Sequence, residues 1–161
     1  MFSAASGAPE THIALYAGRQ LTLAEALQGF YAGFLEPLKQ GDTARLCIKL
    51  HFREMLEPTG VSDAQDAHGI KPLHDALVAL LCRHLGLRKA DTALNRLAIC
   101  LAGLGVQLHV CLDLNDQLLP GITEGAEALA GWAEQLPMFG LAMVQAEAQR
   151  RGVTVSGDQL R

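Results

Sequence analysis

Apolar residues recur at helical spacing through most of the chain, and no stretch alternates between apolar and polar positions as a half-buried strand would. Leu23, Leu27, Phe30, Phe34 and Leu38 fall three or four residues apart, which is the period of one face of an α-helix. Four later stretches repeat this spacing. The pattern predicts an all-α protein of about five helices, at residues 22–39, 43–57, 62–85, 91–112 and 123–151.

Capping residues mark the expected helix boundaries. An N-cap side chain accepts a hydrogen bond from a first-turn amide, and a Glu or Gln three residues later can reach back to the cap. Gly86 and Gly152 stand where two of the helices are expected to end. The candidate N-caps are Thr22 with Glu25, Ser62 with Gln65, Asp91 and Thr123.

Two prolines fall inside expected helices. Proline has no amide hydrogen, and its ring clashes with the carbonyl four residues earlier, so it kinks or breaks a helix interior. We therefore expect a break from Gly69 to Pro72 and a kink at Pro137. A bend at Pro72 would turn His74 toward the space shared with the first two helices, where it could bond a ligand.

The last two expected helices carry more apolar surface than the first three can cover. Residues 91–112 are apolar nearly all the way round, and a wide apolar stripe runs over residues 126–144. Exposed apolar surface of this extent usually faces a partner. We therefore expect a two-fold homodimer. Its expected contacts are Leu101, Leu104, Leu108, Trp132 and Phe139.

The composition fits one domain of ordinary size. The 161 residues are 50% hydrophobic, which is enough for a single core. We expect the domain to span residues 21–152, after an irregular N-terminal segment at 1–20 and before a frayed tail at 153–161. The net charge is -4 and the basic residues are scattered, so there is no phosphate-binding stripe and this chain alone is not expected to bind nucleic acid.

The cysteines and the longest uncharged stretch bear on the cellular setting. All four cysteines fall on expected helix faces among apolar neighbours, as in proteins of a reducing compartment. The uncharged residues 97–112 fall short of the roughly 20 apolar residues that a membrane span requires. We therefore expect a cytoplasmic protein with no membrane helix.

No motif assembles a catalytic or metal centre. Cys47 and His51 lie four residues apart, and His109 lies near Cys111, but a structural zinc site needs four ligands and the chain has neither CxxC nor HExxH. No Ser or Cys stands on a glycine-flanked strand-to-helix turn. We expect no metal, no cofactor and no enzymatic activity.

Aromatic and methionine side chains from three helices could line a small-molecule pocket, which is typically apolar with a few polar anchors. The expected ligand-binding residues are Phe30, Phe34, Phe52, Met55 and His74. Polar residues also interrupt the apolar segments, and with Trp132 they could line the same pocket as its polar anchors: His51, Arg53, Arg96, Gln107 and His109. Taken singly, each apolar residue is more often core, and each polar one more often has an internal hydrogen bond or an exposed side.

Two short motifs carry a resemblance to a known family. Arg53-Glu54-Met55-Leu56-Glu57-Pro58-Thr59 is followed by Ile70-Lys71-Pro72-Leu73-His74 and by a long apolar helix. In these motifs the chain resembles the ligand-binding half of TetR-family transcriptional regulators. It looks most like the CecR-like branch, which has a similar Arg-Glu-x-x-x-Pro-Thr and Pro-Leu-His pair. The resemblance covers residues 21–151, and the order and lengths of the expected helices agree with it.

The resemblance implies a function. In such regulators an N-terminal helix-turn-helix binds the operator, an all-helical domain binds an inducer, and the last two helices of each subunit pair in a four-helix dimer interface. The matched positions give roles to Arg53 and Glu54 and to Pro72 with His74. No helix-turn-helix precedes Leu21, so we expect DNA contact only through a unit absent from this chain.

Two functions remain open from the sequence. One is the effector-sensing and dimerisation domain of a TetR-like repressor, which binds a small, largely apolar molecule. The alternative is a structural dimerisation module with a filled core and no ligand. A cavity of roughly 300 Å³ or more between the first four helices would favour the first. A small helical enzyme would need a convergent acid, base and nucleophile, and the sequence offers no such set.

Overall fold

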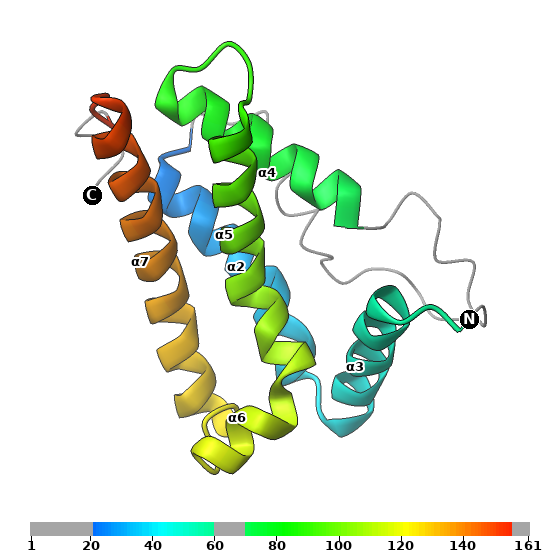
Figure 1. The fold of residues 1–161 in the computed structure, drawn as a ribbon. Coiled ribbons are helices and arrows are strands. Elements are labelled where there is room, and N and C mark those ends of the chain that lie inside the picture. The colour runs from blue at the N-terminus through cyan, green and yellow to red at the C-terminus, as the bar shows by residue number, and fades with distance from the viewer. Residues whose placement is uncertain (1–20, 60–69, 156–161) are drawn as a thin grey trace.

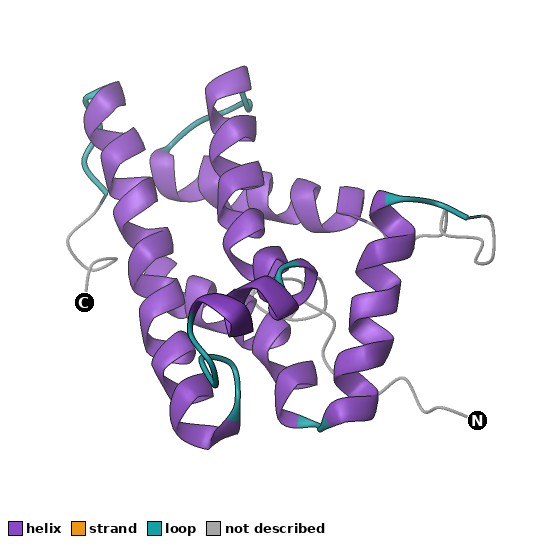
Figure 2. Ribbon diagram, turned by 60° about the horizontal axis from the view of Figure 1, so that its bottom comes forward, coloured by secondary structure: helices purple, strands orange, loops and turns teal. Residues whose placement is uncertain are grey.

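A computed structural model describes residues 21–59 and 70–155. Over these residues the protein is built from helices and loops, with no strand (Figure 1 and Figure 2), which confirms the expected all-α fold. The short α6 brings the described helices to six. They are α2 (Leu23–Lys39), α3 (Asp42–Leu56), α4 (Ile70–Leu85), α5 (Thr92–Val110), α6 (Leu112–Leu118) and α7 (Gly125–Arg151).

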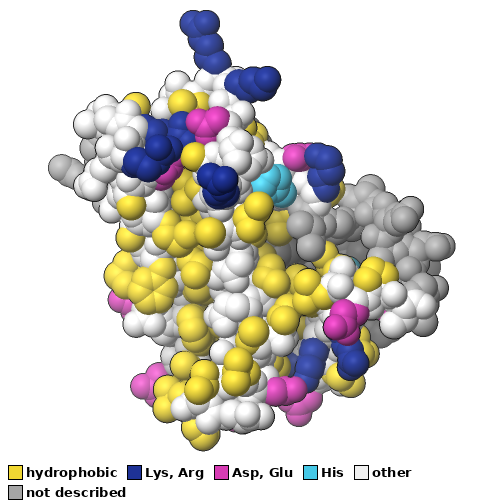
Figure 3. Space-filling view, in the orientation of Figure 1, with side chains coloured by type: hydrophobic (Ala, Val, Ile, Leu, Met, Phe, Trp, Pro, Cys, Tyr) yellow, Lys and Arg dark blue, Asp and Glu magenta, His cyan; other side chains and the backbone are white. Residues whose placement is uncertain are grey.

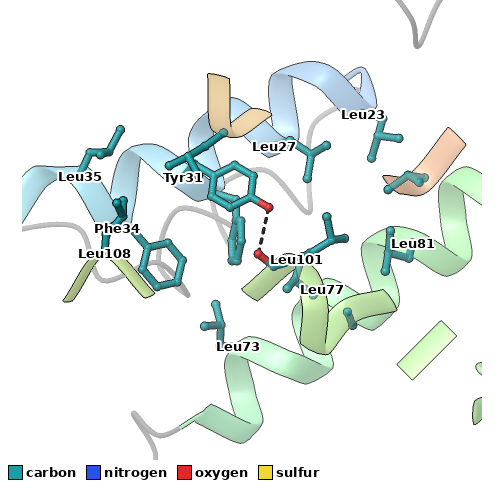
Figure 4. Close-up of a cluster of buried hydrophobic side chains, with 14 of the residues drawn as sticks. Leu23, Leu27, Tyr31, Phe34, Leu35, Leu73, Leu77, Leu81, Leu101 and Leu108 are labelled. Carbon is teal, nitrogen blue, oxygen red and sulfur yellow. Dashed lines mark hydrogen bonds between the residues drawn. The ribbon is translucent and has the colours of Figure 1, made fainter. Parts of the chain in front are cut away.

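The core forms around α2, which lies behind α5 and α7 in the view of Figure 1 and packs most extensively against α7. Leu23, Leu27, Phe30 and Tyr31 of α2 are fully buried. The Tyr31 hydroxyl donates a hydrogen bond of 2.9 Å to the carbonyl of Leu101 on α5 (Figure 4), and burial raises the pKa of this phenol. The apolar residues that recur at helical spacing in the sequence therefore form the face of α2 that packs against its neighbours.

Two of the predicted caps are present. The Thr22 hydroxyl accepts from the amide of Glu25 at 3.2 Å, and the Glu25 carboxylate accepts from the amide of Thr22 at 2.9 Å. The Asp91 carboxylate accepts from the amide of Leu94 at 2.8 Å. The prediction that Thr123 caps the last helix is wrong. α7 begins at Gly125, its N-cap is Glu124, and Thr123 is buried. The Ser62–Gln65 pair lies outside the described residues.

Pro72 does not break its helix as predicted. Ile70, Lys71 and Pro72 are already regular helix, with Pro72 the third residue of α4, and Gly69 lies outside the described residues. Amides of the first helical turn have no intrahelical acceptor, so a proline costs little there. Pro137 lies within α7, which runs without interruption from Gly125 to Arg151.

The charged ends of α5 and α7 are joined. The guanidinium of Arg151 donates two hydrogen bonds of 2.8 Å to the carboxylate of Asp91, which holds the pKa of that carboxyl below its usual range. After α7, Val155 is 8% exposed and belongs to the core. Val153 and Val155 of the expected tail therefore pack against the domain.

Among the described helices, α5 is long and apolar enough to cross a membrane by length and composition, with a mean hydropathy of 1.4 over its most apolar stretch. A core helix meets the same criterion, and α5 packs against α2, α3, α4 and α7 and has Leu94, Ala98, Leu101 and Leu108 among its buried residues.

Candidate effector site and dimer face

A buried imidazole joins α2, α3 and α5. His109 of α5 is 1% exposed, and its Nε2 lies 2.8 Å from the carbonyl oxygen of Phe34 on α2. The Phe52 ring of α3 stacks on the His109 ring, with centroids 5.3 Å apart and planes 13° apart. The Phe34 ring lies 6.3 Å from the same imidazole. Phe34, Phe52 and His109 thus form a cluster of two phenyl rings around one titratable group, which we call the His109 cluster.

The partner of Nε2 fixes the protonation of His109. A carbonyl oxygen can only accept, so Nε2 must carry the hydrogen and donate it to Phe34. Burial lowers the pKa of His109, and the hydrogen bond to Phe34 opposes that shift only in part. The imidazole is therefore neutral at physiological pH, and its Nδ1 has a free lone pair. Nδ1 is buried and has no hydrogen-bond partner among the described residues.

The five expected ligand-binding residues are only partly brought together. Phe30 and Phe34 are buried in the core with ring centroids 5.2 Å apart, and Phe52 reaches the same region through His109. Met55 is half-buried on α3. His74 is half-buried on α4, and its Nε2 lies 2.8 Å from Oδ1 of Asn95 on α5.

The five expected ligand-binding residues do not include His109, which the sequence places only among the polar residues that interrupt the apolar segments. Its signal was present, because a titratable residue interrupts the uncharged residues 97–112. The choice of His74 instead depended on a break from Gly69 to Pro72, whereas residues 70–72 are regular helix.

An open cavity of about 900 Å³ lies at the opposite end of α3. Arg45 holds this region together, since its Nε donates to the Leu38 carbonyl at 3.2 Å and its Nη2 to the Thr123 carbonyl at 2.7 Å. None of the expected ligand-binding residues lines this cavity. Its walls are Leu38, Lys39, Gly41, Asp42, Arg45, Glu124, Gly125, Ala126, Leu129, Ala130 and Ala133.

Helix α3 lies on the outside of the core, where Arg45 bonds two backbone carbonyls and Lys49 pairs with Asp113 of α6. None of its residues is buried, although Phe52 and other side chains are half-buried against α2 and α5. Leu46, Leu50 and Leu56 are each more than half exposed. At its start, Gly41 has a φ of 95°, a left-handed value that favours glycine. α3 therefore covers the His109 cluster without being part of the core.

The five residues expected at a dimer interface divide into two groups. Leu101 and Leu108 are 0% exposed within the single chain, so they are not available to a partner, contrary to the expectation. Leu104 and Trp132 are half-buried, and the indole of Trp132 donates to the Ile122 carbonyl at 2.9 Å. Phe139 is 42% exposed.

The outer faces of α5 and α7 form an apolar surface. Ile99, Met138 and Phe139 are exposed on it, and α7 has no Lys, Arg, Asp or Glu between Glu134 and Glu147. Figure 3 shows hydrophobic side chains over α5 and α7, with charged side chains gathered toward the two ends of that face. We call the exposed part of α5 and α7 between Arg96 and Val110 and between Glu134 and Glu147 the α5–α7 face.

The family model for the C-terminal domain of the HTH-type transcriptional dual regulator CecR matches residues 23–143. The chain belongs to this family. The resemblance to the regulatory half of TetR-like regulators is thereby confirmed, and the match runs from the start of α2 into α7. Neither the curated proteins nor the solved structures contain a match.

The motifs that carry the CecR-like resemblance have a structural role. The Glu54 carboxylate accepts from the amide of Thr59 at 2.8 Å and from its hydroxyl at 2.7 Å, which closes the turn after α3 around Pro58. Arg53 is exposed. Among the described residues, no group of three or more His, Cys, Asp or Glu side chains could hold a metal ion.

Proposed function

We propose that this CecR-like domain dimerises through its α5–α7 face and senses a small, largely apolar molecule bound beneath α3. Family membership supports the role in a transcriptional regulator. The observation that carries the sensing role is a helix without a buried residue lying over a buried aromatic and imidazole cluster. Such an arrangement combines a site of the right chemistry with a cover that can move.

The contacts at both ends of α3 suggest how a bound effector would act on the dimer. A molecule that binds beside His109 in contact with the Phe52 ring would push that ring, and with it α3, outward. Arg45 at the other end of α3 bonds the carbonyl of Thr123, two residues before α7 begins. A shift of α3 would therefore be transmitted through Arg45 to the start of α7, which is one of the two helices of the α5–α7 face. An effector acts only by its difference in affinity for the two arrangements, typically about 1 to 3 kcal/mol.

A structural dimerisation module with a filled core is the second candidate. Close packing favours it: a Cβ at Gly105 would stand 2.5 to 2.7 Å from three ring atoms of Phe34. The open cavity beside Arg45 gives the effector another place to bind, away from His109. A module without a ligand and an effector site beside Arg45 each lead to predictions that differ from those of a site under α3.

A ligand screen with two α3 variants separates these functions. We expect at least one compound from a library of small apolar molecules to raise the melting midpoint of the wild-type protein. Phe52→Ala removes the ring over His109 and should abolish that rise. Leu56→Ala, at a side chain 57% exposed on the same helix, should retain it. A library without a stabilising compound favours the structural module, and an unchanged response of Phe52→Ala moves the site away from His109.

A further inference from the structure

The unused lone pair of His109 Nδ1 specifies the chemistry of the molecule that would bind there. Nε2 is committed to the Phe34 carbonyl, so the remaining hydrogen-bonding capacity of the ring is one acceptor. That acceptor is buried and unpartnered among the described residues. A buried acceptor without a donor is destabilising, and a ligand that supplies the donor removes this cost.

The neighbours of His109 specify the rest of the molecule. Phe34 and Phe52 present ring surfaces to the imidazole from α2 and α3. Flat apolar groups pack well against such rings. α3 is the element that would move to admit a ligand, because Phe52 is half-buried on a helix without a core residue.

We propose that the effector is a compound with a flat apolar body and a neutral hydroxyl or N–H group that donates a hydrogen bond to Nδ1 of His109. This inference rests on the proposed sensing function and narrows its ligand class. Carboxylates and ethers are disfavoured, because their oxygen lone pairs would face the lone pair of Nδ1.

The test uses matched pairs of probes that differ in the donor. 4-Propylphenol is compared with 4-propylanisole, and indole with 1-methylindole, by calorimetric titration of the full chain. 4-Propylbenzoate serves as the anionic probe. We expect the phenol and indole to bind about tenfold tighter than their methylated partners, and the benzoate to bind most weakly.

Two variants identify the acceptor. His109→Phe keeps a flat ring beside Phe52 but removes both nitrogens, and should reduce the phenol affinity to that of the anisole while leaving the anisole affinity unchanged. His74→Phe is the matched control, because His74 already has a partner in Asn95. It should preserve the preference for the donor. Loss of that preference in His74→Phe but not in His109→Phe would overturn the assignment.

A spectroscopic measurement on the wild-type protein does not depend on how well the variants fold. In histidine-labelled protein, 4-propylphenol should shift the nitrogen resonance of the unprotonated Nδ1 of His109 toward that of a hydrogen-bonded acceptor, and 4-propylanisole should not. Equal affinities within both probe pairs, or an unmoved Nδ1 resonance with the phenol bound, overturn the donor inference but leave an effector-sensing domain intact. No binding by either donor probe also overturns it, and the library screen then decides the sensing function separately.

Discussion

At the scale of single residues, Gly105 shows how tightly the core is packed beside the candidate site. Any side chain there would meet the Phe34 ring, whereas a Cβ at Gly131 of α7 would have no atom within 4 Å. Gly105→Ala should therefore lower the free energy of unfolding by about 1 to 3 kcal/mol through overpacking. Gly131→Ala should raise it by about 0.5 to 1 kcal/mol, because alanine favours the helix.

Urea denaturation of both variants at one protein concentration measures these changes. Equal effects of the two substitutions would mean that Phe34 yields easily to a larger neighbour. A yielding Phe34 would remove the packing argument for a filled core.

His109 should give the protein a distinctive pH dependence. Its pKa is lowered in the folded state by burial, whereas in the unfolded chain it is about 6.5. As the pH falls below about 6.5, the unfolded chain takes up a proton at His109 before the folded protein does. The stability is therefore fully present above this pH and is lost as the pH falls toward the lowered folded value.

The measurement is the free energy of unfolding as a function of pH for the wild type and His109→Phe. The other five histidines are common to both proteins, so the difference between the two curves isolates this residue. The wild type should lose more stability between pH about 6.5 and 5. Parallel curves would show that the folded and unfolded states bind this proton equally.

At the scale of elements, local signals in the sequence predicted well and tertiary ones did not. The caps at Thr22 and Asp91 depend on residues three apart, so the sequence contains everything that they need. Thr123 looked equally suitable, but it is buried in the turn before α7, where its carbonyl bonds Arg45. α6 has seven residues and none of them is buried, so it leaves no helical period to detect.

The candidate site shows the same limit. Phe30, Phe34 and Phe52 could be selected as apolar residues on two expected helices, but the sequence did not indicate which histidine would meet them. His74 is bonded to Asn95, and His109 reaches Phe34 and Phe52 because α5 packs against both α2 and α3. Similarly, the all-round apolar character of α5 did not distinguish Leu101 and Leu108, which face α2, from residues on the outer face.

The α5–α7 face leads to a prediction about these two helices. Phe139→Glu would place an unpaired carboxylate within the uncharged part of α7, so a dimer buried there should dissociate to monomers. Gln149→Glu adds the same charge to an exposed position of α7 beyond Glu147, and should leave the dimer intact. Sedimentation velocity distinguishes the two. A Phe139→Glu protein that remains dimeric would place the interface elsewhere.

At the scale of the whole molecule, contacts within one chain connect α3, the His109 cluster and the α5–α7 face. α3 covers the His109 cluster, Arg45 ties α3 to the turn before α7, and α7 contributes to the α5–α7 face. Each connection rests on a separate contact, so the three parts can be disrupted independently. Under the proposed function, a small molecule bound beneath α3 would change the geometry of the dimer.

The central claim is that the chain is a dimeric, effector-binding domain, and native mass spectrometry of the protein purified from cells tests it most directly. The account predicts a species of twice the chain mass that also carries the additional mass of a small molecule, released when the protein is denatured. A species of the single chain mass without any bound molecule, at concentrations well above those of ordinary dimer dissociation, would contradict it.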